Sequence, residues 1–119
     1  MRTAIFKVSG VPDAGDLIVL SVRAPKGGAS NAKFTAKGER VAAELINGEA
    51  VKIVTPPESP NEIALGLSLS FGTHEFCTNM FAPRVSGDLL IVGVGDGMEN
   101  VTFVPEVHGT GSVKIEEVQ

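Results

Sequence analysis

The chain has 119 residues, a length that fits one domain, so the sequence predicts a single β-rich domain over residues 1–119. Its formal net charge is −4, and its 10 Lys and Arg form no cluster that would bind a nucleic-acid backbone. Hydrophobic residues make up 43% of the chain and are punctuated by 14 Gly and 7 Pro, which is typical of many short strands joined by turns.

Several residue types and segments are missing from the sequence. Trp and Tyr are absent, so we expect no sugar-stacking surface and no carbohydrate partner. The one cysteine, Cys77, excludes an internal disulfide framework and fits assembly in a reducing cytosol. The N-terminus lacks the apolar run of a secretion signal, and no stretch reaches membrane-spanning length. We therefore expect a soluble protein, made in the cytoplasm without a signal peptide and with no membrane partner.

The first third of the chain predicts three strands. Residues 3–8 alternate apolar and polar side chains, residues 17–22 are apolar enough for an interior strand, and residues 32–36 form a short half-buried one. Clusters of Gly, Pro, Asp, Ser and Asn separate the three segments and predict turns or loops.

Residues 38–47 change the period. Their apolar side chains recur at the i, i+1, i+4, i+5 spacing of one helical face, namely Val41, Ala42, Leu45 and Ile46. Asn47-Gly48 then supplies a natural helix stop, so the sequence predicts a short α-helix here.

The same Asn47-Gly48 pair allows an alternative, a two-residue hairpin turn. That alternative would pair Ile46 with Glu49 and Glu44 with Val51, which mixes polar and apolar side chains on each face. The helix is favoured because its apolar face is more consistent.

The clearest alternation lies in Asn61–Phe71 and predicts the strand around which the domain is organised. One parity carries large apolar side chains, which are Ile63, Leu65, Leu67, Leu69 and Phe71. The other parity is small and smooth, and consists of Ala64, Gly66, Ser68 and Ser70. Packing of the chain's own helix over this smooth side is the favoured explanation. The alternative is a subunit interface, for which these four small residues are the candidates.

The last third returns to strands. Residues 72–85 predict a loop with some strand, and residues 88–94 predict a continuous apolar strand. A turn over 95–100 and a return strand over 101–107 follow, with Pro105 marking an edge or a bulge. Residues 113–118 predict a final half-exposed strand.

Gly93-Val-Gly-Asp-Gly97 follows a strand and resembles the glycine-rich turn of a dinucleotide site. Such a turn binds phosphate only when a helix N-terminus follows it. Here a strand pattern follows, so the sequence favours a hairpin turn.

Candidate metal ligands are His74, Glu75 and Cys77, joined by His108 or Asp96 from elsewhere in the chain. Structural zinc usually takes four ligands with paired Cys or His spacing, and this chain has one Cys and two His. A nucleophilic pair of Cys77 with either His would need a third orienting residue that the sequence does not show. We therefore predict surface His residues and a packed Cys, no catalytic, cofactor-binding or metal-binding residues, and no enzyme activity.

Five short motifs follow one another between residues 14 and 67. They are Ala14-Gly-Asp16 leading into Leu-Ile-Val-Leu, Phe34-Thr-Ala36, Val41-Ala-Ala-Glu-Leu-Ile-Asn47, Val51-Lys-Ile-Val, and Asn61-Glu-Ile-Ala-Leu. Together they resemble a module of bacteriophage and prophage structural proteins, especially tail-associated ones, in which two strands, a helix and two strands follow in order. The resemblance covers under half of the chain, departs at the Pro56–Pro60 linker and after Phe71, and carries over no functional residues.

The sequence thus predicts a mainly antiparallel β-sandwich or barrel-like domain with one short α-helix at about 38–47. The resemblance implies a non-catalytic structural subunit of a symmetric assembly, such as a phage tail or capsid-decoration protein. Its partners would be its own copies and other structural proteins, and it would need no cofactor. It would be made in the host cytoplasm and would be located in the virion after assembly. The alternatives are a soluble adaptor or inhibitor that binds a host protein, and a small cupin-like metal enzyme.

Overall fold

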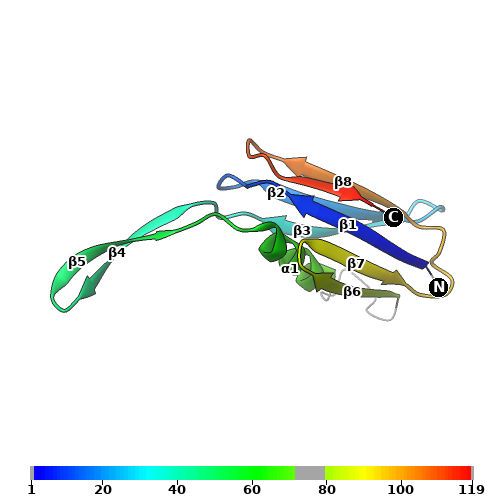
Figure 1. Ribbon diagram of the computed structural model, residues 1–119. Helices are drawn as coiled ribbons and strands as arrows, with labels where there is room; N and C mark the ends of the chain where they lie inside the picture. Colours follow the sequence, from blue (N-terminus) through cyan, green and yellow to red (C-terminus); the bar gives the residue numbers. More distant parts are fainter. Residues whose placement is uncertain (1, 72–79, 119) are drawn as a thin grey trace.

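The computed structural model describes residues 2–71 and 80–118. In these residues it contains nine strands and one helix (Figure 1). The elements are β1 (Arg2–Ser9), β2 (Leu17–Arg23), β3 (Ala29–Thr35), β4 (Arg40–Ile46), β5 (Glu49–Thr55), α1 (Pro60–Phe71), β6 (Phe81–Ser86), β7 (Leu89–Val94), β8 (Thr102–His108) and β9 (Lys114–Glu117).

Two antiparallel sheets form the body of the protein. One has the strand order β6-β7-β1-β9, and the other has the order β3-β2-β8. In the first sheet Phe6 lies opposite Leu90, and in the second Ile18 lies opposite Phe34. The predicted mainly β, antiparallel sandwich-like fold with one short helix is therefore confirmed.

The core lies between the two sheets and follows the period-2 alternation of their strands. Phe6, Val8 and Leu90 come from the first sheet and are fully buried, as are Ile18 and Leu20 from the second. The rings of Phe6 and Phe103 meet edge to face across the sandwich, with centroids 5.3 Å apart. Burying a side chain of this size stabilises the fold by about 1.5–3 kcal/mol, so these residues hold the two sheets together.

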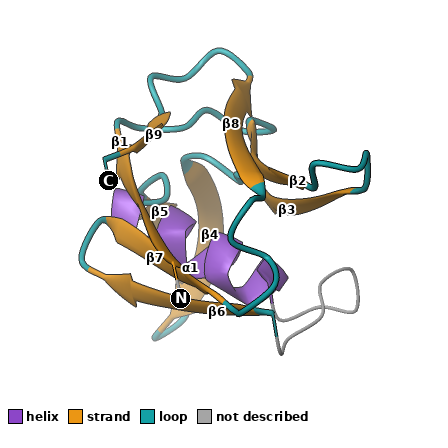
Figure 2. Ribbon diagram, turned by 90° about the vertical axis from the view of Figure 1, so that its right-hand side faces the viewer, coloured by secondary structure: helices purple, strands orange, loops and turns teal. Residues whose placement is uncertain are grey.

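The helix α1 closes one side of the sandwich. It packs against β3 of one sheet and against β6 and β7 of the other (Figure 2). Its buried residues are Ile63, Ala64, Leu67 and Phe71, which is the i, i+1, i+4, i+8 spacing of a helical face. On the opposite side of the body, β8 and β9 lie next to each other.

The prediction of a strand over Asn61–Phe71 is therefore wrong. Every second residue in this segment is large and apolar, so the pattern satisfies a strand and a helix at once. The start of the segment decides between them. The backbone N–H of Glu62 donates to Ser59 Oγ, the N–H of Ser59 donates to the Glu62 carboxylate, and both distances are 3.2 Å. This capping box, with Pro60 at the first helical position, favours a helix.

The predicted helix over 38–47 is also wrong, because these residues form a hairpin of β4 and β5. Asn47 and Gly48 adopt φ values of 54° and 81°, as the two central positions of a tight hairpin turn require. Ile46 pairs with Glu49 and Glu44 with Val51, which is the pairing that counted against the hairpin in the sequence. The mixed faces are tolerated because this hairpin does not lie over the core.

The turn over 95–100 does not close a hairpin as predicted. The strand before it, β7, belongs to the first sheet, while β8 after it pairs with β2 in the second. The chain therefore crosses between the sheets at this point. Pro105 does lie on an edge strand, as predicted, because β8 borders its sheet.

Candidate functional site

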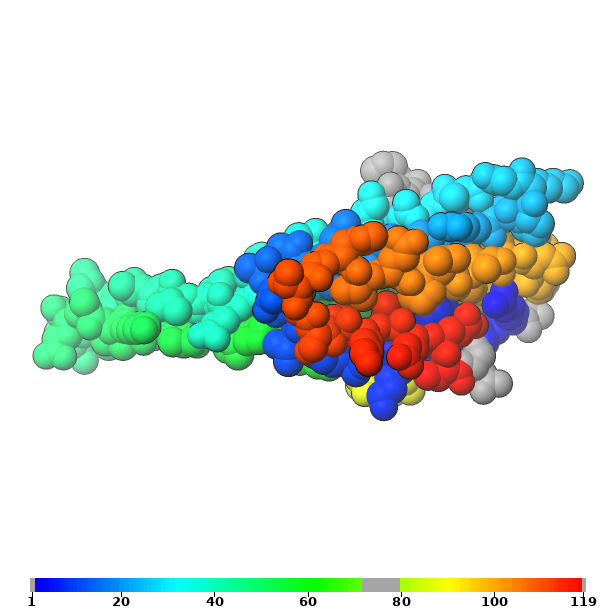
Figure 3. Space-filling model, turned by 90° about the horizontal axis from the view of Figure 1, so that it is seen from above, coloured from blue at the N-terminus to red at the C-terminus, as the bar shows by residue number. Residues whose placement is uncertain are grey.

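The most distinctive feature of the protein is a hairpin that leaves the body, here called the arm and formed by residues 40–55. Figures 1 and 3 show it projecting from one end of the two sheets. The molecule consequently measures 60 × 26 × 23 Å along its principal axes. Every residue of β4 is exposed, and the two strands of the arm pair with each other as a separate two-stranded sheet.

The register of the arm gives it two different faces. Val41 lies opposite Val54, Ala43 opposite Lys52, and Leu45 opposite Ala50, so these side chains share one face. We call this set the apolar face, and Lys52 is its one charged member. The other face is mixed and carries Arg40, Ala42, Glu44, Ile46, Glu49, Val51, Ile53 and Thr55.

The apolar face is open to solvent in the single chain. Leu45 near the arm tip is 78% exposed, and Val41 and Val54 are 57% and 52% exposed. Single exposed apolar residues are ordinary, but a contiguous set on one face marks an interaction surface. An isolated two-stranded hairpin is also only marginally stable in water. The arm therefore has the composition of an interaction surface, and a partner that covered it would stabilise the hairpin.

The root of the arm is fixed to the body by a buried carboxylate. Glu58 accepts hydrogen bonds from the backbone N–H groups of Lys37, at 2.6 Å, and of Gly38, at 2.9 Å. These donors precede β4, whereas Glu58 follows β5, so one carboxylate joins both ends of the arm. Gly38 has a φ of 69°, and a side chain there would collide with the backbone of Ala14. We call this arrangement the root clamp.

Charge at the root clamp is stabilised by its hydrogen bonds. Burial alone would raise the pKa of Glu58. The N–H groups of Lys37, of Glu58 itself and of Gly38, helped by the charge of Arg40, outweigh this effect and hold the pKa below its ordinary value of 4.5. Glu58 is therefore ionised near neutral pH and acts as a structural acceptor.

A second buried carboxylate supports the same end of the body. Asp16 accepts N–H groups from Asp13 at 2.9 Å, Thr110 at 3.1 Å and Gly111 at 2.9 Å. The N–H of Asp13, opposed by burial and assisted by the N–H groups of Thr110 and Gly111, lowers the pKa of Asp16. The Asp16 carbonyl also accepts the N–H of Ala36 at 2.8 Å, which ties this loop to the chain entering the arm. Both buried carboxylates are thus occupied in holding backbone.

The four candidate interface residues from the sequence lie on α1 and not on a strand. Ala64 is fully buried, and Gly66 lies against the ring of Phe34. The N–H of Lys33 donates to Ser70 Oγ at 2.9 Å, while Ser68 is half-buried. Because successive helical residues turn by about 100°, these positions do not form one smooth face. Much of this small-residue set packs against β3 of the same chain.

The structure describes only some of the candidate metal ligands and candidate nucleophilic residues. His74, Glu75 and Cys77 lie outside the described residues. His108 is exposed on β8, with its Nε2 atom 3.0 Å from Glu106 Oε2, and Asp96 is exposed in the turn after β7. Within residues 2–71 and 80–118, no group of three or more His, Cys, Asp or Glu side chains could hold a metal ion.

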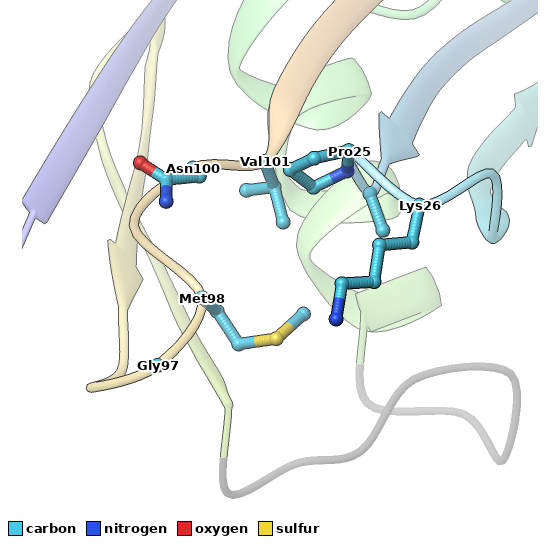
Figure 4. Close-up of a pocket in the computed structure, with 7 residues that line it drawn as sticks. Pro25, Lys26, Gly97, Met98, Asn100 and Val101 are labelled. Atoms are coloured by element: carbon cyan, nitrogen blue, oxygen red, sulfur yellow. The ribbon is translucent and has the colours of Figure 1, made fainter.

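A pocket of about 400 Å³ lies between the loops at 24–26 and 97–101 (Figure 4), which are at the end of the body away from the arm (Figure 1). Its lining residues are Ala24, Pro25, Lys26, Gly97, Met98, Asn100 and Val101. Lys26 is the one ionisable side chain among these seven, so the lining supplies no acid–base pair.

Sequence reasoning missed the arm as the candidate functional site. The signal that could have found it is Asn47-Gly48 between two apolar-rich runs, which is the strongest short-range mark of a hairpin. No family model, curated protein or solved structure matches this chain. Within the described part of the chain, no helix has the length and apolar character needed to cross a membrane.

Proposed function

We propose that this protein is a non-catalytic structural subunit of a symmetric assembly, built by contacts between copies of the chain. The observation that carries the proposal is the arm, whose apolar face is exposed in a single copy. Covering that face would remove apolar surface from water at about 25 cal/mol per Å². It would also stabilise a hairpin that is marginal by itself.

The arm lies at one end of an elongated molecule, which favours a particular kind of contact. An arm that docks on a different surface of the next copy makes a heterologous contact, and repetition of such contacts closes a ring or extends a filament. This geometry suits a tail or capsid-decoration component. The assignment to a phage virion rests on the sequence motifs of residues 14–67. The element order found there, β2-β3-β4-β5-α1, differs from the order of two strands, a helix and two strands in the module that these motifs resemble.

The proposal places the protein in the host cytoplasm during synthesis and in the virion after assembly. Its partners are its own copies and other structural proteins of the particle. The proposal involves no nucleic acid, membrane, carbohydrate or cofactor, and no catalysis.

Solution mass at several concentrations tests this function. We expect the wild-type chain to form a trimer, a pentamer or a larger ring, and the double variant Val41→Ser, Leu45→Ser to remain near the 12.4 kDa monomer. Val11→Ser is the matched control, because Val11 is 50% exposed but lies outside the arm, and its mass should equal that of the wild type.

Two results would contradict the proposal. One is a wild-type monomer at every concentration, which would favour an adaptor if a one-to-one partner were then isolated. The other is an assembly that survives the loss of Val41 and Leu45. Stoichiometric metal in the purified protein, lost on replacement of His108, would instead favour the metal enzyme.

A further inference from the structure

We propose that the apolar face of the arm docks on the exposed side of α1 in a second copy, so that the copies associate head to tail. This inference rests on the proposed function and adds the surface that receives the arm.

The receiving surface is an exposed stripe on α1. Glu62, Leu65 and Leu69 follow the i, i+3, i+7 spacing of one helical side, and all three are exposed. Leu69 is 77% exposed and Leu65 is 47% exposed, although other residues of the same helix are fully buried. Leu45 at the arm tip, at 78%, and Leu69 on α1 are the two most exposed large hydrophobic residues of the described chain. The protein thus carries two separate apolar surfaces that one contact could cover.

Charge and length match between these two surfaces. Lys52 is the single charge on the apolar face, and Glu62 is the single charge on the α1 stripe. The stripe spans about 10 Å at 1.5 Å per helical residue. The apolar face spans about 13 Å between the Val41 and Leu45 pairs at roughly 3.3 Å per strand residue. With Leu45 placed between Leu65 and Leu69, the Lys52 side chain comes within reach of Glu62.

The arm cannot use the α1 stripe of its own chain. Figures 1 and 3 show the arm extending away from the body, and the root clamp on Glu58 fixes both of its ends in that direction. Pro56 and Pro57 stiffen the exit from β5. The occupant of the stripe is therefore the arm of another copy.

An arm-to-arm contact fits these observations less well. A two-fold contact would bring Lys52 of one apolar face toward Lys52 of the other, which is unfavourable. It would also leave Leu65 and Leu69 uncovered on both copies.

Cysteine crosslinking tests the contact directly. In a full-length Cys77→Ser background, Leu45→Cys combined with Leu69→Cys should give a ladder of disulfide-linked dimers, trimers and higher species under mild oxidation. A mixture of the two single variants should give heterodimers only. Leu45→Cys combined with Thr102→Cys is the matched control, because Thr102 is exposed on β8 away from α1, and it should give no ladder.

A second variant gives a readout without engineered cysteines. Leu69→Ser should raise the concentration needed for half-assembly by about tenfold or more, since it removes a large apolar side chain from the contact. Its unfolding midpoint as a monomer should fall only by the small loss of helix propensity from Leu to Ser, because Leu69 is exposed.

The outcomes separate this inference from the proposed function. Suppose that the chain assembles but Leu69→Ser does not weaken assembly, and that Leu45→Cys links to itself or to Thr102→Cys as readily as to Leu69→Cys. The proposed contact between the arm and α1 is then wrong, while the proposed structural function stands. If the wild-type chain is monomeric at every concentration, both fail.

Discussion

Two buried carboxylates set the geometry of the arm at the level of single residues. Asp16 and Glu58 are 2% and 7% exposed, and their oxygens accept backbone N–H groups from segments distant in sequence. A buried N–H group without an acceptor costs about 1–3 kcal/mol of stability. Each of these carboxylates therefore stabilises the fold mainly by accepting hydrogen bonds from buried backbone N–H groups. Within the described residues, every buried side-chain nitrogen or oxygen has a partner.

Glu58→Ala should lower the free energy of unfolding by about 1–3 kcal/mol, because it leaves the N–H groups of Lys37 and Gly38 without their acceptor. Glu58→Gln should cost less, since its one carbonyl oxygen can still accept a hydrogen bond. Chemical denaturation measures both variants. Glu39→Gln removes the same charge from an exposed position and should stay within about 0.5 kcal/mol of the wild type.

The stability of the fold should also fall in acid, because Asp16 and Glu58 stabilise it only while they are ionised. The folded-state pKa values of Asp16 and Glu58 lie below the ordinary values of 3.8 and 4.5. Their contribution is therefore fully present above those ordinary values and is lost as the pH falls through the lowered ones. Denaturation midpoints should be level down to about pH 5 and should fall as the pH drops below the ordinary values of 4.5 and 3.8. In the Asp16→Asn, Glu58→Gln double variant this drop should be smaller, and an equal drop would assign it to other groups.

At the level of elements, the sheets could be predicted from the sequence and the two most informative segments could not. Strands such as β1 and β7 have one face on a core, and burial enforces their alternation. In α1 the alternating leucines mislead because Leu65 and Leu69 are left exposed instead of joining Ile63 and Leu67 in the core. The capping box of Ser59 and Glu62 was the more reliable signal.

The arm could not be predicted from side-chain periodicity for a different reason. Periodicity reports which side of an element faces a core, and neither side of the arm does so in one copy. Its apolar residues therefore fit a helical face as well as a strand. The backbone requirement of Asn47-Gly48, with positive φ at both positions, was the deciding feature.

The packing of α1 against β3 is so close that adding one methyl group at Gly66 should disturb it. In Gly66→Ala the added Cβ would overlap the Phe34 ring, so the packing loss of about 1–3 kcal/mol should exceed the gain of about 1 kcal/mol in helix propensity. We expect a net loss of stability on thermal denaturation. Ser68→Ala on the same helix is the control and should stabilise by about 0.5 kcal/mol. Equal stabilisation by both variants would contradict the observed packing.

At the level of the whole molecule, the fold separates a self-sufficient body from an arm that is not self-sufficient. The body closes its core with two sheets and α1. The arm holds exposed Leu45 away from that core, and the root clamp keeps it extended. A chain built this way is complete only when another surface covers the arm.

Hydrogen exchange as a function of protein concentration tests this account most directly. In dilute protein the backbone amides of β4 and β5 should exchange far faster than those of β1 and β7, because no other element of residues 2–71 and 80–118 pairs with the arm. As the concentration rises and copies associate, protection should grow in the arm and on α1 while the body strands stay unchanged. Arm amides that remain fast at every concentration, or that are fully protected in a dilute monomer, would contradict the account.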